Sequence, residues 1–307
     1  MNYDIRINNN LEGQGKLELD RLGFLAQIIK KIAQRALLMQ LFGYSKVSLP
    51  GKYKKYLNIY MSGQYADNQT TGFNLDTDNF GTIPLQLDAF RDKSNLKELT
   101  PISLVIASFR AALVEDEDKN QLDEPLINEL IRFRNFFGSD KEEVVLSNRG
   151  SVPEVAINTK EIERIEYLYK TIPEPQKVII NGVIDELKFS KKQMVLLTKN
   201  KERVVITAKD KELIGDISAY FGKEITLTGM AHYKPGGQLS YVGLESFGKP
   251  GKGDRYFSKK PDKMSTQQQI ALQLRQGKKN NPLDDIIGKW PGDESDEEFE
   301  KMLKDLD

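Results

Sequence analysis

Few side chains in this sequence are of the types that perform acid–base or nucleophilic chemistry. His232 is the only histidine, and the chain contains no cysteine. The lack of cysteine excludes disulfides, thiolate nucleophiles and zinc–thiolate sites. His232 could act as a general base, but no serine or carboxylate partner lies at a fixed spacing from it, and a lone histidine beside a turn is usually structural. The sequence therefore favours a non-enzymatic function and offers no catalytic residue.

Carboxylates are the next candidates, because convergent Asp and Glu side chains can hold divalent cations. The densest run before residue 125 contains Asp116, Glu117, Asp118, Asp123 and Glu124. Runs of this kind are normally solvated loops, and nothing in their spacing brings several carboxylates to one point. We therefore predict no metal site and no cofactor.

Lysines and aromatic residues between positions 177 and 247 are of the types that hold single-stranded nucleic acid. Cations contact phosphates, and flat rings stack on bases. The candidate residues are Lys188, Lys191, Lys192, Lys199, Lys201, Arg203, Tyr233 and Tyr241. The alternative is that these lysines provide solubility in hairpin turns and that the tyrosines pack inside the protein. The sequence leaves both interpretations open.

The elements that would position these residues are short strands. Apolar and β-branched runs at 178–184, 194–197, 203–206, 224–231 and 240–245 are separated by turns rich in Gly and Pro, and a helix at about 210–221 interrupts them. Strands of this length and spacing favour a closed five-stranded barrel over residues 176–247. With its paired glycines, Gly182 and Gly229, the segment resembles an OB-like fold. Small barrels of this type host unrelated functions, so the fold alone assigns none.

Residues 1–172 predict a mixed α+β domain, which makes the fold class of the chain α+β. Residues 3–7 alternate as a strand does, and apolar residues from Leu22 to Met39 recur at helical spacing. Further strands are expected at 56–61 and 72–75, and helices are expected from Pro101, from Glu124, and from a cap at Thr159 through residue 169. The change of pattern at residues 172–175 marks a domain boundary. The sequence assigns no role to this domain.

Composition limits the partners of the chain. Its 45 basic and 45 acidic residues cancel, so an electrostatic partner must bind a local patch rather than a global field. No signal peptide precedes the first strand, and no apolar run is long enough to span a bilayer. We expect a cytoplasmic protein that does not bind membranes.

Residues 248–264 are rich in Gly, Pro and Lys and predict a basic flexible linker. The following segment, 265–307, is a predicted partner-binding tail. Ser295 and Glu298 have the spacing of a capping box, and the apolar residues after them recur at helical steps. A helix this short is marginal in water unless it packs against another surface.

This tail resembles the C-terminal segment of bacterial antitoxins that block PIN-domain ribonuclease toxins. The similar elements are Asn281-Pro282-Leu283, the apolar hook Ile286-Ile287-Gly288-Lys289-Trp290, and the acidic turn into the last helix. The resemblance implies that the hook lies in the active-site groove of the toxin, with Trp290 as anchor and Lys289 directed at the carboxylates of the nuclease. The implied partner-binding residues are Leu283, Ile286, Ile287, Lys289, Trp290, Phe299, Met302, Leu303 and Leu306.

Three functions remain open at this point. The first is an antitoxin-like protein that inhibits a ribonuclease toxin through its tail. The second is a single-stranded nucleic-acid-binding protein that uses the barrel, with the acidic tail as a regulatory or partner-docking element. The third is an enzyme of unrecognised type. The sequence does not identify the partner protein or the oligomeric state.

Overall fold

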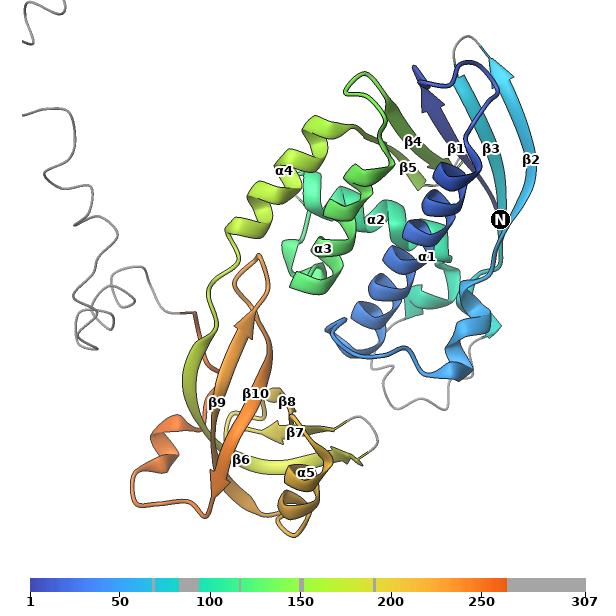
Figure 1. The fold of residues 1–307 in the computed structure, drawn as a ribbon. Helices are drawn as coiled ribbons and strands as arrows, with labels where there is room; N and C mark the ends of the chain where they lie inside the picture. The colour runs from blue at the N-terminus through green and yellow to red at the C-terminus, as the bar shows by residue number, and fades with distance from the viewer. Residues whose placement is uncertain (68–69, 83–93, 116, 149–151, 190–191, 264–307) are drawn as a thin grey trace, which may run out of the picture. The chain divides into compact units, whose positions relative to one another are not determined.

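The computed structural model describes residues 1–67, 70–82, 94–115, 117–148, 152–189 and 192–263. These residues form a sheet domain followed by a closed five-stranded barrel, which confirms the predicted α+β class (Figure 1). They belong to one compact unit that ends at Lys263. The predicted tail, 265–307, and with it every proposed partner-binding residue, lies outside the described residues. None of the described helices has the length and apolar character needed to cross a membrane.

The sheet domain is built on five strands in the order β2-β3-β1-β4-β5, each antiparallel to its neighbours. The strands are β1 (Asn2–Asn8), β2 (Ile59–Asp67), β3 (Thr70–Thr77), β4 (Glu143–Asn148) and β5 (Val152–Ile157). The alternation predicted for residues 3–7 is confirmed, because β1 is the central strand and buries Tyr3, Ile5 and Ile7.

Four helices share one apolar core with this sheet, and Figure 1 shows them gathered beside it. They are α1 (Leu19–Phe42), α2 (Pro101–Leu113), α3 (Glu124–Arg132) and α4 (Thr159–Lys170). Helix α1 buries the predicted apolar stripe and ends at Gly43, whose φ of +78° is a left-handed conformation that suits glycine. The cap of α4 is Asn158 rather than the predicted Thr159, because the Asn158 side chain accepts a hydrogen bond from the Glu161 amide.

One predicted strand is partly helical. Residues Gly51–Leu57 form a 3-10 helix, and strand β2 begins only at Ile59. Tyr53 and Leu57 are both buried in the core of the sheet domain, so this segment is fixed by packing rather than by strand pairing. Of the strand predicted at residues 56–61, only residues 59–61 belong to β2, and the predicted alternation fails there because Tyr60 and Met61 are both exposed.

The barrel contains β6 (Gln176–Lys188), β7 (Gln193–Leu197), β8 (Arg203–Thr207), helix α5 (Lys211–Ser218), β9 (Glu224–Tyr233) and β10 (Leu239–Gly248). Around the barrel the order is β10-β8-β7-β6-β9, and only the β8–β10 pair is parallel. Alternate residues of β9 point into the core, from Ile225 to Tyr233, and leave His232 and Met230 on the outer face. This arrangement agrees with the OB-like barrel expected from the sequence.

The paired glycines mark places where backbones come close together. A Cβ atom on Gly182 would lie 2.6 Å from the carbonyl oxygen of Leu197, and one on Gly229 would lie 2.3 Å from that of Gly243. A side chain at either position would collide with the neighbouring strand. Glycine is therefore required by the closeness of the strands and not by an unusual φ angle.

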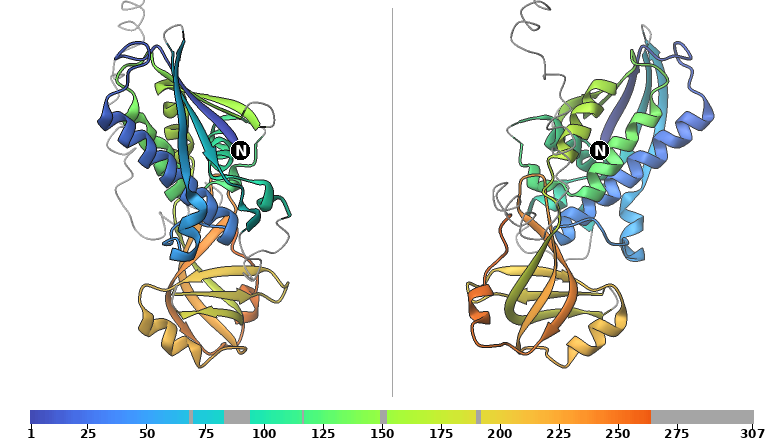
Figure 2. Two further views of the ribbon diagram at one scale, coloured as in Figure 1. Left: turned by 90° about the vertical axis from the view of Figure 1, so that its right-hand side faces the viewer. Right: turned by 60° about the vertical axis from the view of Figure 1, so that its left-hand side comes forward.

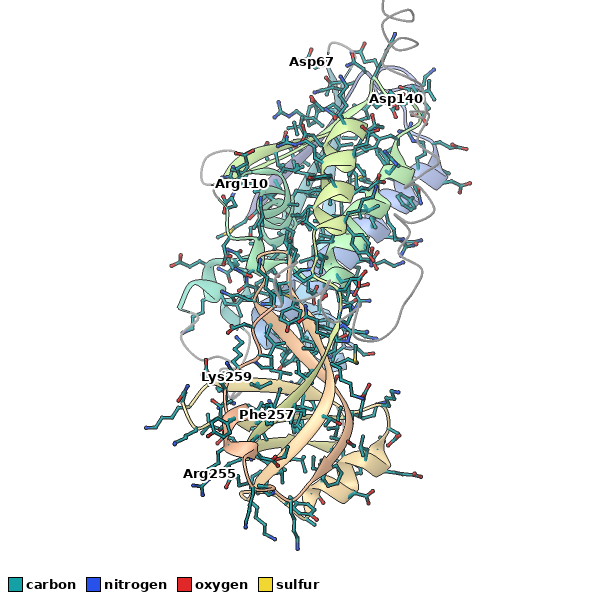
Figure 3. All side chains as sticks on the ribbon, turned by 90° about the vertical axis from the view of Figure 1, so that its left-hand side faces the viewer. Asp67, Arg110, Asp140, Arg255, Phe257 and Lys259 are labelled. Carbon is teal, nitrogen blue, oxygen red and sulfur yellow. The ribbon has the colours of Figure 1, made fainter. Side chains whose placement is uncertain are left out.

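The segment after β10 differs from the predicted flexible linker. Residues Asp254–Phe257 form a 3-10 helix, and the Asp254 carboxylate accepts a hydrogen bond from Thr226 of β9. Ser258 is buried, where its hydroxyl accepts from the Lys199 amide, and the Lys260 amide donates to Glu202. Figure 3 shows Arg255, Phe257 and Lys259 on the outside of this segment. These hydrogen bonds to the barrel explain why a segment without an apolar pattern still packs.

Candidate functional site

The candidate site lies on the outer face of the β9–β10 hairpin. The antiparallel register places Tyr241 opposite His232 and Gly243 opposite Met230. The rings of His232 and Tyr241 are stacked, with centroids 4.4 Å apart and planes inclined by 15°. Directly opposite residues on one face of a strand pair are close enough for such contacts. The hairpin therefore presents a two-ring platform.

A loop from the sheet domain covers the Tyr241 end of this platform. After α1 ends at Gly43, the Tyr44 ring lies 5.9 Å from the Tyr241 ring. Lys46 donates a 2.9 Å hydrogen bond from Nζ to the Tyr241 hydroxyl, and this Nζ is 5.5 Å from the ring centroid. The hydrogen bond raises the pKa of Lys46, so the lysine stays cationic. Tyr241 is only 7% exposed, and His232 is the ring that a ligand can reach.

A cavity of about 580 Å³ adjoins the platform. It is lined by both rings, by Tyr44 and Lys46, by Lys192 and Lys209, and by Glu245 among others. A ligand pocket typically has a volume of about 300–1,000 Å³. The one carboxylate in this set, Glu245, lies 3.6 Å from Lys177, and the three lysines outnumber it. The lining is therefore positively charged.

Two turns of the barrel bring Lys192 and Lys209 together. Lys192 follows the β6–β7 connection with a φ of +53°, and its carbonyl accepts from the Ala208 amide. Its Nζ donates to the Lys209 carbonyl at 2.6 Å, which fixes the lysine at the cavity rim. Lys46, Lys192 and Lys209 form no ion pair within the part of the chain that the structure describes.

The Tyr44 hydroxyl is a buried polar group without a partner among the described residues. Tyr44 is 1% exposed and lines the cavity. Burial, and to a lesser extent Tyr241, raise the pKa of its phenol, so the hydroxyl stays protonated. Buried hydroxyls are nearly always hydrogen-bonded, because an unsatisfied one costs about 1–3 kcal/mol. An acceptor on a molecule in the cavity would satisfy it.

His232 is electrically neutral at pH 7. Burial lowers its pKa, and the charge of Lys46 lowers it further. A neutral imidazole has one donor and one acceptor nitrogen and a flat face, and it does not repel the nearby lysines. A second cavity of about 280 Å³ borders the same two rings, but Asp123 and Glu124 line it, which makes it unsuited to phosphate.

Several of the basic residues predicted to bind nucleic acid form ion pairs within the barrel instead. Lys188 Nζ lies 3.1 Å from Glu186, and Arg203 pairs with both Glu186 and Asp185, the latter at 2.7 Å. Lys199 and Lys201 are exposed in the β7–β8 turn, where Lys201 has a φ of +61°. Lys191 lies outside the described residues. Among the predicted cations that the structure describes, only Lys192 lines the candidate site.

Tyr233 belongs to the barrel core rather than to the platform. It is 3% exposed, and its hydroxyl donates to the carbonyl of Asp262 at 3.0 Å, with the side-chain oxygen of Gln176 as a second acceptor 3.3 Å away. Burial, and secondarily Asp262, raise its pKa to about 12. Tyr241 and Lys192 are thus the two predicted residues that the structure brings together. Sequence reasoning missed Tyr44, Lys46 and Lys209, because no local pattern distinguishes them from ordinary loop residues.

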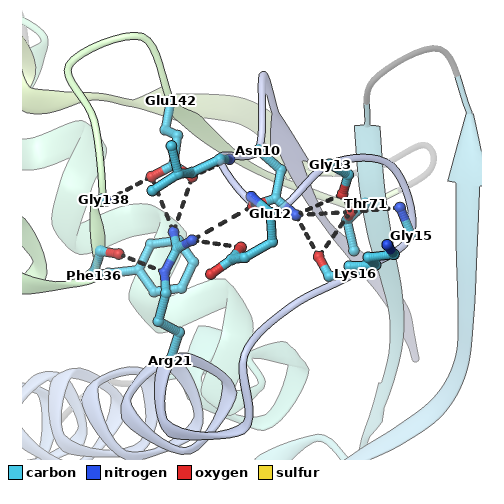
Figure 4. A network of polar contacts seen from close by, with 11 residues as sticks. Asn10, Glu12, Gly13, Gly15, Lys16, Arg21, Thr71, Phe136, Gly138 and Glu142 are labelled. Atoms are coloured by element: carbon cyan, nitrogen blue, oxygen red, sulfur yellow. Dashed lines mark hydrogen bonds and ion pairs between the residues drawn. The ribbon is translucent and has the colours of Figure 1, made fainter.

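A second polar cluster, in the sheet domain, is structural. Arg21 contacts Glu142 at 3.0 Å and Glu12 at 2.6 Å, and its guanidinium lies 4.7 Å from the Phe136 ring centroid (Figure 4). Glu142 is fully buried and also accepts hydrogen bonds from the amides of Leu11 and Gly138. These contacts join the loop after β1 to the segment before β4. The charges of Arg21, Glu12 and Glu142 are therefore paired with one another inside the protein.

The described residues contain no group of three or more side chains arranged to hold a metal ion. The candidate site therefore consists of a ring pair, a protonated phenol and three lysines around one cavity. Comparisons of the chain with models of protein families, with curated proteins and with solved structures found no match.

Proposed function

We propose that the chain binds single-stranded nucleic acid at the cavity beside the His232–Tyr241 ring pair. The observation that carries this proposal is the cluster of Lys46, Lys192 and Lys209, which form no ion pair within the described residues, around a neutral ring that is partly exposed. Phosphates would contact the lysines, and one base would stack on the outer face of His232. We place this activity in the cytoplasm, as the sequence predicts.

The chemistry of the cavity favours a single strand over a duplex. Stacking on a protein ring requires an unpaired base whose flat face is free, and it contributes about 1–3 kcal/mol per base. The Tyr44 hydroxyl could then donate to a base or sugar oxygen, which supplies the partner that it lacks among the described residues. Such contacts accept any base, so we expect weak sequence preference.

The test is the salt dependence of binding to fluorescently labelled single-stranded oligonucleotides, measured by anisotropy. A Lys192→Ala/Lys209→Ala variant should weaken binding, and the slope of log K against log salt should fall by about 1.4, since each lost phosphate contact removes about 0.7. The matched control is Lys199→Ala/Lys201→Ala, which removes the same charge from the β7–β8 turn. An equal loss in both variants, or no salt-dependent binding by the wild type, refutes the proposal.

We also propose, from the amino-acid sequence of residues 281–307, that the tail inhibits a ribonuclease-type partner protein in the manner of an antitoxin. The apolar hook around Trp290 and the amphipathic spacing after Ser295 support this second function. Deletion of residues 281–307 should abolish neutralisation of a toxin encoded by an adjacent gene. Because the cavity lies before residue 264, the same deletion should leave a functional oligonucleotide site. Neutralisation by the truncated chain would refute the antitoxin proposal alone.

A further inference from the structure

Strand β2 is an outer strand of the five-stranded sheet, with β3 as its neighbour on one side. Seven of its register positions pair with residues of β3 between Thr70 and Asp76, and Ile59 pairs with Thr77. Among the described residues, no strand pairs with β2 on the side that faces away from β3. Because unpaired strand edges recruit other strands, natural proteins usually protect them.

The sequence of β2 carries little of this protection. Residues 59–66 contain no charged residue and no proline, and the one protective feature is a shift in register between Met61 and Gly63. The opposite edge strand, β5, contains Pro153, which lacks an amide hydrogen and so blocks pairing at that position. The two edge strands therefore differ in sequence, and β2 is the one without proline or charge over residues 59–66.

Exposed apolar surface accompanies the open edge. Tyr60 is 58% exposed and Met61 is 55% exposed. Both line a groove of about 510 Å³ between β2 and helix α1, whose other walls include Leu22, Leu25, Ile29 and Phe73. Apart from Lys30 and Asn58, the lining of this groove is apolar or aromatic, and an apolar surface beside an edge strand is typical of a protein contact rather than of a solvated face.

The charges at the two ends of β2 indicate which strand fits beside it. The exposed lysines Lys54 and Lys55 precede the strand, and Asp67 ends it (Figure 3). An antiparallel copy of the same strand would bring Asp67 of one chain towards Lys54 and Lys55 of the other, and the uncharged middle would pair without repulsion. A parallel copy would place like charges together.

We propose that β2 pairs antiparallel with β2 of a second copy of this chain, so that one sheet continues through a twofold-symmetric dimer. The pairing covers Tyr60 and Met61 in both copies and closes the two grooves against each other. Isologous contacts of this kind are the commonest form of homodimer. The dimer does not depend on the proposed nucleic-acid site, which lies on the barrel.

The first test measures the mass of the full chain in solution by light scattering or sedimentation velocity. The wild type should be a dimer that dissociates on dilution, and Met61→Lys should be a monomer, because the substitution replaces an apolar contact with a second cation in a groove that already contains Lys30. The control is Tyr167→Lys, which alters an aromatic residue that is 72% exposed on α4, and it should remain dimeric. A monomeric wild type, or a dimeric Met61→Lys variant, overturns the proposal.

The second test does not depend on whether the lysine variant folds. Because the chain has no cysteine, Ser62→Cys introduces a single thiol at an exposed position of β2. A short bismaleimide should link two such chains rapidly, whereas Ser218→Cys on α5, also exposed, should give no cross-link above the level of random collision. Equal cross-linking of the two variants overturns β2 pairing even if the protein is dimeric.

Discussion

Gly229→Ala should destabilise the barrel, because the added methyl group has no room. Its Cβ would lie 2.3 Å from the Gly243 carbonyl oxygen and 2.9 Å from a methyl carbon of Val242. The carbonyl belongs to the neighbouring strand β10 and cannot rotate away, so β9 and β10 must separate locally. Overpacking of this kind costs about 1–3 kcal/mol. For a small domain of about 60–100 residues, each kcal/mol of lost stability lowers the melting temperature by about 4–8 °C.

Gly243→Ala is the matched control, because it makes the same chemical change on the partner strand. Its Cβ would meet nothing closer than the Met230 carbonyl oxygen at 3.8 Å, which is an ordinary contact. Both variants lose glycine's freedom in the unfolded chain, which by itself stabilises by about 0.4–1 kcal/mol. The difference between the two variants therefore isolates the collision, and it should remain at about 1–3 kcal/mol.

Amide hydrogen exchange followed by mass spectrometry is the suitable assay, because it reports on peptides of β9 and β10 separately from the sheet domain. Gly229→Ala should exchange faster throughout the barrel, while Gly243→Ala should resemble the wild type or exchange more slowly. Equal destabilisation of the two variants, or an unaffected Gly229→Ala barrel, would show that the strands are not held as closely as the structure indicates.

Three further predictions concern other parts of the chain. Arg21→Met should lower the free energy of unfolding, measured by urea denaturation, by about 3–5 kcal/mol, because it leaves the carboxylate of Glu142 buried without a cation. Adding Glu142→Gln should recover part of this loss. An Arg21→Met variant as stable as the wild type would contradict the argument. Because the pKa of His232 is lowered in the folded protein, the unfolded chain binds a proton at this residue more readily. The contribution of His232 to the free energy of unfolding is therefore fully present above about pH 6.5 and is lost as the pH decreases towards the lowered pKa. His232→Asn should reduce the slope of the unfolding free energy against pH in this window, and an unchanged slope would contradict the argument. Tyr233→Phe should lower the free energy of unfolding by about 0.5–1.5 kcal/mol and should speed tryptic cleavage within residues 254–263, because its hydroxyl donates a hydrogen bond to this segment. Unchanged cleavage would show that this hydrogen bond does not hold the segment.

Much of the fold could be predicted from local sequence patterns. The alternation in β9 and the apolar stripe of α1 are each properties of a few neighbouring residues, and each predicted its strand or helix correctly. The two barrel glycines lie where the strands approach each other most closely. Prediction was less accurate where tertiary contacts decide the local structure. Residues 254–263 have the composition of a linker, yet they pack because Thr226, Glu202 and Lys199 offer hydrogen bonds to them.

The candidate site was predicted only in part, because it is assembled across a long stretch of sequence. Tyr241 and Lys192 belong to the barrel and were identified by residue type. Tyr44 and Lys46 follow α1 in the other domain, and only the folded chain brings them to Tyr241. Residue type also could not show that Arg203 is neutralised by carboxylates or that Tyr233 points into the core, since both depend on the barrel register.

The barrel closes at a short parallel junction between β8 and β10. Strands β8 and β10 pair at only two positions, Ile206 with Val242 and Thr207 with Gly243, whereas β10 pairs with β9 along most of its length. Thr207 and Gly243 also line the cavity beside the ring pair, so an occupant would touch both sides of this junction. Such an occupant would hold β8 and β10 together. The amides of these strands should be the first in the barrel to exchange their hydrogens in the free protein, and binding should slow their exchange the most.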